Sequence, residues 1–245
     1  LEWWMTYESK KVISCSNSMK WELENHFHLP SEKITVIPNA VDVSKYEKNI
    51  DREAVRRRYG IEPYEKLVLF IGRIVPQKGV EYLLKAIPLI LQQNRDVKFV
   101  IVGDGWSKDY LEDFTKSTGV GEKVRFLGFI SDSELTELTI SSDVLVVPSV
   151  YEPFGIVALE GMAAGVPVVA AYVGGLSEII EHDRTGVLVY PRNVESLAWG
   201  VNRVLSDPGY SRWLVQNAKR RVQEKYSWEA VAHRTIELYE EVSKR

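Results

Sequence analysis

Short apolar segments alternate with segments of helical period from Lys66 onward. Six of the apolar segments are brief and rich in Val, Ile and Leu, which is typical of strands buried in a parallel sheet. They are Leu67–Ile71, Val97–Val102, Val124–Leu127, Val144–Val147, Val166–Ala170 and Val187–Tyr190. Between them, apolar residues recur at helical spacing, as from Val80 to Leu91, where Pro88 should kink the helix. The alternation predicts an α/β fold, a doubly wound parallel sheet with helices on both faces.

Other patterns mark the flanking and connecting segments. The start of the chain predicts helix, strand, helix and strand, with the strands at Lys11–Cys15 and Lys33–Ile37, and Ser227 can cap a last helix. Ser131–Glu134 has capping-box spacing, which predicts a helix directly after it. The charge run Arg52–Arg58 we interpret as a solvated helix face.

Composition and charge narrow the class of protein. The 245 residues carry 31 Lys and Arg against 34 Asp and Glu, a net charge of −3, which argues against a nucleic-acid partner held by bulk positive charge. The one cysteine, Cys15, cannot form an internal disulfide, which fits a reducing compartment. No apolar run reaches the ~18–20 residues of a transmembrane segment and no signal peptide is visible, so we expect a cytoplasmic protein. Because the chain begins with Leu1 rather than Met, we also expect a fragment of a longer protein.

A first candidate site follows the strand that ends at Ile71. Gly72 ends the strand, a loop with Arg73 and Lys78 follows, and a helix opens at Gly79. Helix N-terminal amides and two cations would converge there on one anion, which makes the loop a candidate phosphate site. The loop lacks the spacing of a P-loop, and taken alone it is more simply a surface loop with two cations.

A second candidate site follows the strand at Val144–Val147. A tight turn leads there into a helix, so that backbone N–H groups at the helix start would face the cleft unpaired. These groups belong to Phe154, Gly155 and Ile156. Glu152 precedes the helix and Glu160 lies inside it, and carboxylates so placed suit hydroxyl groups. For Glu160 by itself, stabilisation of the helix dipole or an ion pair is the competing explanation.

Other motifs carry less weight. Val102–Gly105 resembles the start of a dinucleotide fingerprint, but the third glycine is absent, so a plain turn is the better interpretation and an NAD dehydrogenase is disfavoured. Gly174 and Gly175 form a tight loop that a ligand could approach closely. No Gly-x-Ser-x-Gly elbow supports a hydrolase. The histidines have no metal-ligand spacing, and we expect neither a metal nor a cofactor; they are His26, His28, His182 and His233.

The order and spacing of the motifs resemble one family. Gly-Arg-x4-Lys-Gly, Val-Gly-Asp-Gly, Phe-Leu-Gly-Phe-Ile, Pro-Ser-x-Tyr-Glu-Pro-Phe-Gly-x3-Leu-Glu and Gly-Gly-Leu-Ser-Glu-Ile-Ile follow one another along the chain. The series resembles the C-terminal half of a retaining GT-B glycosyltransferase of family 4 (glycosyltransferase group 1), the group of glycogen synthases and mannosyltransferases. The resemblance implies a Rossmann-like nucleotide-sugar-binding domain at residues 43–226. It makes residues 1–42 the tail of an N-terminal acceptor domain with the interdomain crossover, and 227–245 a terminal helix that packs back on that domain.

The resemblance also implies roles for the residues at matching positions. Arg73 and Lys78 would bind the diphosphate of a nucleotide-sugar and stabilise the leaving group, and Glu152 would orient the donor sugar, so these three are the implied catalytic residues. Glu160 would hold the ribose hydroxyls. The remaining implied binding residues are Ile130, with Ser131 and Asp132, beside the base, and Phe154, Gly155, Ile156 and Val157 at the helix start. At the crossover Asn39, Ala40 stands where the family usually has Gly.

The implied reaction is transfer of a hexose with retention, by front-face displacement through an oxocarbenium-like transition state and without a metal. Its partners would be a nucleotide-sugar donor, a glycan or other hydroxyl acceptor, and the missing N-terminal GT-B domain, which holds the acceptor in the family. We therefore expect little or no turnover by this chain alone. We also expect exposed apolar faces at Trp3, Trp4, Trp21 and Trp228.

The identity of the donor stays open at this point. Glu-Pro-Phe-Gly, with Trp-x-x-Tyr-Glu near the start, favours α-glucan synthesis from ADP- or UDP-glucose over GDP-mannose and other donors. The Glu-x7-Glu context disfavours a GT-B epimerase of UDP-sugars. The alternative from another class is a non-catalytic nucleotide-sugar-binding or interaction module that needs a separate N-terminal half.

Overall fold

The fold is known from a computed structural model that describes residues 2–244, with side chains from Trp4 onward. Its centre is a parallel six-stranded sheet in the order β5-β4-β3-β6-β7-β8. The strands are β3 (Lys66–Ile71), β4 (Val97–Val102), β5 (Val124–Gly128), β6 (Val144–Val147), β7 (Val168–Ala171) and β8 (Val187–Val189). In register, Lys66 lies beside Val97 and Leu69 beside Leu145. The predicted parallel sheet is confirmed, and its strand order reverses between β3 and β6, the point at which such sheets bind ligands.

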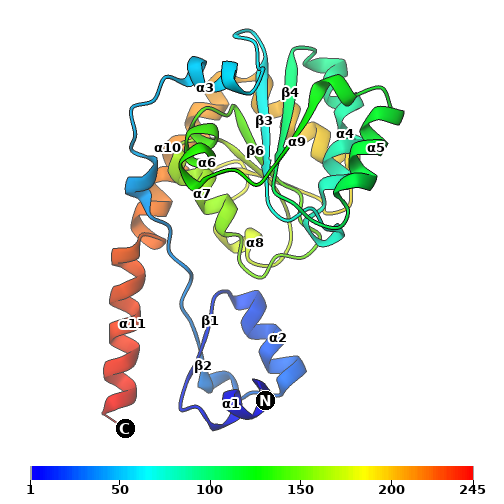
Figure 1. Ribbon diagram of the computed structural model, residues 1–245. Coiled ribbons are helices and arrows are strands. Elements are labelled where there is room, and N and C mark those ends of the chain that lie inside the picture. Colours follow the sequence, from blue (N-terminus) through cyan, green and yellow to red (C-terminus); the bar gives the residue numbers. More distant parts are fainter. Residues whose placement is uncertain (1, 245) are drawn as a thin grey trace.

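Helices cover both faces of the sheet, as Figure 1 shows for α6 and α7 on one side and α4 and α5 on the other. One face packs against α3 (Arg52–Arg58), α6 (Asp132–Ile140), α7 (Ile156–Ala164), α8 (Leu176–Ile179) and α10 (Pro208–Lys225). The other packs against α4 (Val80–Gln93), α5 (Lys108–Ser117) and α9 (Val194–Ser206). Successive strand residues supply the two cores in turn, since Leu67 and Leu69 belong to the first core and Val68 and Phe70 to the second.

Two local predictions can be followed in these helices. Ser131 and Glu134 form the predicted capping box at the start of α6, each side chain pairing with the other residue's backbone N–H. α4 continues through Pro88 to Gln93, so this proline does not end the helix although it lacks the N–H that would reach Leu84.

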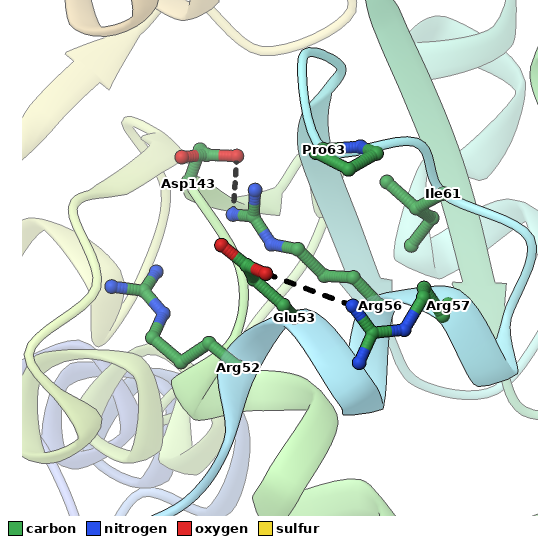
Figure 2. A pocket seen from close by; sticks show the side chains of 7 residues that line it. All are labelled: Arg52, Glu53, Arg56, Arg57, Ile61, Pro63 and Asp143. Atoms are coloured by element: carbon green, nitrogen blue, oxygen red, sulfur yellow. Dashed lines mark hydrogen bonds and ion pairs between the residues drawn. The ribbon is translucent and has the colours of Figure 1, made fainter.

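Arg56 shows that the charge run of α3 is not simply a solvated face. Its side chain, only 13% exposed, donates from Nε to the Ser141 carbonyl at 2.8 Å and pairs from Nη2 with Asp143 at 2.7 Å. Together with Arg52, Arg57 and others it lines a cavity of about 200 Å³ near the start of β3 and β6 (Figure 2). Our interpretation of the run is therefore wrong for Arg56, because a backbone carbonyl and a carboxylate at the sheet edge replace water around its guanidinium.

A smaller N-terminal unit precedes the sheet. It comprises α1 (Glu2–Glu8), β1 (Val12–Ser14), α2 (Asn17–Phe27) and β2 (Ile34–Val36), in which β1 and β2 pair in parallel. The predicted order of helix, strand, helix and strand is confirmed. Short 3₁₀ turns complete the chain at Ser31–Lys33, Val43–Tyr46, Pro76–Lys78 and Gly121–Lys123.

The last helix, α11 (Trp228–Ser243), begins at Ser227, whose side chain accepts from the Ala230 N–H as predicted. It returns to the linker that follows β2, where Ile37 and Ala40 pack with Val231 and Leu238. Figure 1 shows α11 leaving the end of α10 and running alongside the N-terminal part of the chain.

Exposed aromatic side chains occur on these flanking parts. Trp4, Trp21 and Trp228 are exposed, as predicted, whereas the side chain of Trp3 lies outside the described residues. Among the helices of residues 2–244, none is both long enough and apolar enough to cross a bilayer.

Candidate functional site

The loops that follow β3 and β6 touch at the switch point of the sheet. The Val150 N–H donates to the Gln77 carbonyl at 2.9 Å. Gly79, which starts α4, has φ +71°, and a Cβ there would lie 1.9 Å from the Pro148 carbonyl oxygen. Only glycine fits this close approach, so the two candidate loops of the sequence are held against each other by their backbones.

Lys78 and Glu152 are the predicted site residues that this contact brings together. Lys78 Nζ lies 2.7 Å from Glu152 Oε2, and the two side chains are 22% and 13% exposed. Ser149 Oγ donates to the same carboxylate oxygen at 3.2 Å. Arg73 lies on the same loop as Lys78, is exposed, and makes no hydrogen bond or ion pair through its guanidinium within residues 2–244. Lys78 is therefore paired with a carboxylate, whereas the guanidinium of Arg73 can meet an anion.

The start of α7 adds backbone donors. Gly155 is the N-cap, with φ +109° and no side chain to cap the helix. In the described part of the chain, no acceptor pairs with the N–H groups of Phe154, Gly155 and Ile156. These are the donors that the sequence predicts, and at a helix N-terminus they favour an anion or a polar oxygen.

Glu160 lies one turn into α7 beside residues of the linker. Tyr46, Lys45 and Asp132 are the polar and charged residues near its carboxylate. Burial raises the pKa of Glu160, while Lys45 and the Tyr46 hydroxyl act in the opposite direction. Lys45 Nζ in turn lies 2.6 Å from Asp132 Oδ1. Glu160 is thus a half-buried carboxylate near the linker, and its predicted role stays a prediction.

The residues predicted to lie near a base flank the start of α6. Ile130 is half-buried and packs against the same core as Val157 of α7. The Ser131 hydroxyl is engaged with Glu134, donating to its carboxylate at 2.6 Å. The structure therefore places an apolar surface at Ile130, whereas the Ser131 hydroxyl already has a partner.

The Gly174–Gly175 loop closely approaches the backbone of the loop after β6. A Cβ on Gly174 would lie 2.2 Å from the Glu152 carbonyl oxygen, and the Gly175 N–H donates to that oxygen at 2.9 Å. A ligand approach at these glycines stays a prediction. Their role is to pack the loop after β7 against the backbone that carries Glu152.

The N-terminal unit is anchored to the same loops. Ser16 Oγ donates to the Pro153 carbonyl at 2.6 Å. The Glu178 carboxylate accepts from the Asn17 N–H at 2.9 Å and from the Ser18 N–H at 2.8 Å, so it caps α2 from across the interface. The Tyr151 hydroxyl donates to Glu22 at 2.7 Å, which raises the pKa of Tyr151 to about 12.

The sequence does not predict these contacts, because they join residues that are far apart along the chain. Lys45 and Tyr46 are more than a hundred residues from Glu160 in sequence, and Glu178 is as far from Asn17. The signal in the sequence is weak, since Glu178 stands out only as part of the motif Gly-Gly-Leu-Ser-Glu-Ile-Ile. For a metal, residues 2–244 offer no cluster of three His, Cys, Asp or Glu side chains.

Comparison with known proteins gives two family matches that together span most of the chain. Residues 51–221 match the family described as Glycosyl transferases group 1, and residues 1–45 match Glycosyltransferase Family 4. An uncharacterized glycosyltransferase of Methanocaldococcus jannaschii is 49% identical over 98% of this chain and 62% of its own length. A glycogen synthase of Mycobacterium tuberculosis is 35% identical over 98% of this chain and 56% of its own.

A solved structure of similar fold contains UDP-glucose. HepE of Anabaena, in complex with UDP-glucose, superposes with a TM-score of 0.85 at 27% identity, covering 97% of this chain and 64% of that one. The chain thus spans about three fifths of the proteins that it resembles, as predicted for a C-terminal GT-B half. On the match over residues 51–221, the chain belongs to the glycosyl transferases group 1 family.

Proposed function

We propose that this chain is the donor-binding part of a retaining glycosyltransferase that moves a hexose from a nucleotide-diphospho-sugar to a hydroxyl acceptor. The observation that carries the proposal is the meeting of Lys78 and Glu152 at the switch point, 2.7 Å apart, with Arg73 on the same loop. Cations, a carboxylate and unpaired helix-start amides are the groups that a diphosphate joined to a sugar requires.

Arg73 and Lys78 would stabilise the leaving group. As the bond between the anomeric carbon and the phosphate oxygen breaks, negative charge grows on the diphosphate, and Arg73 and Lys78 would stabilise it. Arg73 has no partner to give up within residues 2–244, whereas Lys78 must share its ammonium between Glu152 and the diphosphate. We therefore expect Arg73 to contribute more to donor affinity and Lys78 more to the placement of Glu152.

Glu152 and the start of α7 would bind the sugar. The Glu152 carboxylate can accept hydrogen bonds from sugar hydroxyls, and the N–H groups of Phe154, Gly155 and Ile156 can donate to sugar or phosphate oxygens. A donor held from one face in this way leaves the leaving-group face to the acceptor, which fits displacement with retention. We expect the acceptor to be held by the part of the relatives that this chain does not span.

Glucose is the sugar we favour, from ADP-glucose or UDP-glucose, in α-glucan synthesis. The Glu-Pro-Phe-Gly sequence and the likeness to a glycogen synthase support this choice. The likeness to a structure that holds UDP-glucose supports a nucleotide-sugar donor in general.

Calorimetric titration with ADP-glucose, UDP-glucose and GDP-mannose tests the proposal. We expect one donor to bind, and its affinity to fall at least ~30-fold in an Arg73→Ala/Lys78→Ala variant, since two charge-assisted contacts are lost. Lys85→Ala is the matched control, because Lys85 pairs with Glu81 on the surface of α4 and should leave affinity unchanged.

Two outcomes would count against the proposal. If none of the three nucleotide-sugars binds the unaltered chain, the chain is not the donor-binding part of a glycosyltransferase. Binding that survives in the double variant contradicts the site. Binding without transfer, even when an acceptor and the rest of a related enzyme are supplied, would instead favour the non-catalytic module.

A further inference from the structure

Two adjoining cavities lie at the amino-terminal edge of the sheet, opposite the edge that carries Lys78 and Glu152. The first is the cavity of about 200 Å³ that Figure 2 shows beside α3, and the second has a volume of about 490 Å³. Arg52 and Asp143 line both, so the cavities meet at these side chains. Because Asp143 directly precedes β6, whereas Glu152 follows it, the cavities and the candidate donor site belong to opposite ends of the same strand.

The cavities carry an excess of positive charge, although the net charge of the chain is −3. Among the described residues that line them, two are carboxylates, Glu53 and Asp143, and five are cations: Arg52, Arg56, Arg57, Lys66 and Arg212. Arg56 and Lys66 share Asp143, at 2.7 and 4.0 Å. Arg57 pairs with Glu53 at 3.6 Å. The two carboxylates are therefore already used by three of the five cations.

The other two cations, Arg52 and Arg212, have no carboxylate partner. Arg52 donates to a neutral acceptor, the Ser142 carbonyl, at 3.1 Å, and in Figure 2 it stands beside the ion pairs without joining one. Burial and the like charge of Arg56 lower the pKa of Arg52, which a bound anion would counteract. Arg212 is exposed and makes no hydrogen bond or ion pair through its side chain within residues 2–244. Two guanidinium groups, one from α3 and one from α10, are thus available to an anion.

The second cavity adds an apolar wall to these cations. The wall comes from the residues before β7, from the end of α9 and from α10, and consists of Pro167, Val204, Leu205, Pro208 and Val215. The volume of about 490 Å³ lies within the ~300–1,000 Å³ that is typical of small-molecule sites. A bare inorganic anion would leave the apolar wall uncovered, so the cavity suits an anion with an apolar body.

We propose that the two cavities form a second binding site, which takes a small phosphate monoester with an apolar body. Arg52 and Arg212 would bind the phosphate, and the apolar wall would cover the body. Guanidinium groups match the oxygen geometry of phosphate, and a phosphate monoester carries about −1.5 to −2 charges at pH 7, which suits two unpaired cations better than the single charge of a carboxylate does. The inference does not depend on the proposed function, because neither Arg73 nor Lys78 takes part in it.

Calorimetric titration with phenyl phosphate tests this site, both in the unaltered chain and in the Arg73→Ala/Lys78→Ala variant, which lacks the cations of the candidate donor site. Inorganic phosphate, benzoate and phenol are the comparison ligands, since they lack the ring, the phosphate and the charge in turn. We expect phenyl phosphate to bind about fivefold to tenfold more tightly than inorganic phosphate, because the ring buries apolar surface. Benzoate should bind more weakly than phenyl phosphate, and phenol should not bind measurably.

Substitutions of the two unpaired arginines test where the phosphate binds. Arg52→Gln and Arg212→Gln should each weaken phenyl phosphate at least about fivefold, because a charge-assisted contact is lost. Since the Arg212 side chain has no partner to lose within residues 2–244, its variant should fold like the parent by circular dichroism. Arg220→Gln is the matched control: Arg220 is also exposed on α10, but it bonds to Asn217 and lines neither cavity, so affinity should not change.

A substitution in the apolar wall tests where the ring binds. Val215→Thr keeps the shape of the side chain and adds a hydroxyl, so it should weaken phenyl phosphate about twofold to fivefold and leave inorganic phosphate unchanged.

Four results would overturn the inference. They are no binding of phenyl phosphate by the Arg73→Ala/Lys78→Ala variant, an affinity that neither Arg52→Gln nor Arg212→Gln lowers, an equal affinity for benzoate, and an equal affinity for inorganic phosphate. Failure of every nucleotide-sugar to bind the unaltered chain would contradict the proposed function alone, since the phenyl phosphate titration does not use the donor site.

Discussion

Replacement of Asp143 by Ala removes an acceptor at which two strands and a helix meet. Asp143 Oδ2 accepts from the buried Leu67 N–H at 2.7 Å and from Arg56 Nη2 at 2.7 Å (Figure 2). Leu67 opens the buried part of β3, and Asp143 directly precedes β6, so the carboxylate ties the two central strands to α3.

The loss in the free energy of unfolding can be estimated from these two contacts. A buried N–H without an acceptor costs about 1–3 kcal/mol. Arg56 keeps its bond to the Ser141 carbonyl, and because Arg56 and Asp143 are 13% and 20% exposed, loss of the ion pair adds only ~1–2 kcal/mol. We expect Asp143→Ala to lower the free energy of unfolding by roughly 2–4 kcal/mol and Tm by roughly 5–15 °C.

Urea unfolding followed by far-UV circular dichroism measures this loss. Asp143→Asn, which keeps one carbonyl oxygen as acceptor, should lose about half as much. A cycle with Arg56→Met should give a coupling energy near 1 kcal/mol or more, within the range of ~0.5–3 kcal/mol for residues in contact. Glu53→Gln is the control, since Glu53 lines the same cavity but is exposed and pairs with Arg57 at 3.6 Å.

A small or additive loss of stability would contradict this role of Asp143. A loss below about 1 kcal/mol for Asp143→Ala would mean that water replaces the carboxylate at both donors. A double variant whose loss equals the sum of the single losses would mean that Arg56 and Asp143 do not stabilise each other.

Three other predictions concern the interface, the thiol and the helix cap. Glu178→Ala removes the α8 carboxylate that caps α2, so amide exchange in α2 and β1 should accelerate at least ~tenfold while exchange in the central strands is unaffected. Equal acceleration throughout the chain would contradict a local effect of this cap. Burial raises the pKa of the Cys15 thiol, so its reaction with a disulfide reagent at pH 8 should be several-fold slower than that of glutathione and should recover in denaturant. A native rate equal to that of glutathione would show an accessible thiolate. The Ser131 hydroxyl lowers the pKa of Glu134, so Ser131→Ala should raise that pKa toward its ordinary value in a carbon-detected NMR titration. The ionised cap stabilises the fold at pH values above the pKa that Glu134 has in the unfolded chain, and this effect is lost as the pH falls through the lower pKa of the folded chain. The free energies of unfolding of Ser131→Ala and of the parent should therefore converge in acid. Parallel curves of stability against pH would exclude an ionic cap.

The sheet could be predicted because strands buried on both faces are continuous apolar runs. The predicted Val97–Val102 and Val144–Val147 coincide with β4 and β6. The segment predicted at Val166–Ala170 begins instead at Val168, because Pro167 has no N–H to donate to a ladder. The periodicity of one sequence is enough for such elements, since neighbouring residues determine them.

The candidate site could be predicted only where its residues follow the strands at the switch point. Arg73, Lys78 and Glu152 follow two strands of one parallel sheet, and such strands bring their carboxyl ends to one edge. Glu178 could not be expected beside α2, because its partners lie more than a hundred residues away and no periodic pattern encodes such a contact. The predicted domain limits at 42 and 226 and the roles of the site residues stay predictions.

The contact of α11 with the linker has a kinetic consequence during synthesis. Ile37 and Ala40 pack against Val231 and Leu238, so the two halves of this small core leave the ribosome about 190 residues apart. At roughly 5–20 residues per second, the linker waits some 10–40 s for its partner helix. Throughout that interval the nascent chain exposes apolar residues that the finished protein covers, and a chaperone that recognises extended apolar segments can bind them.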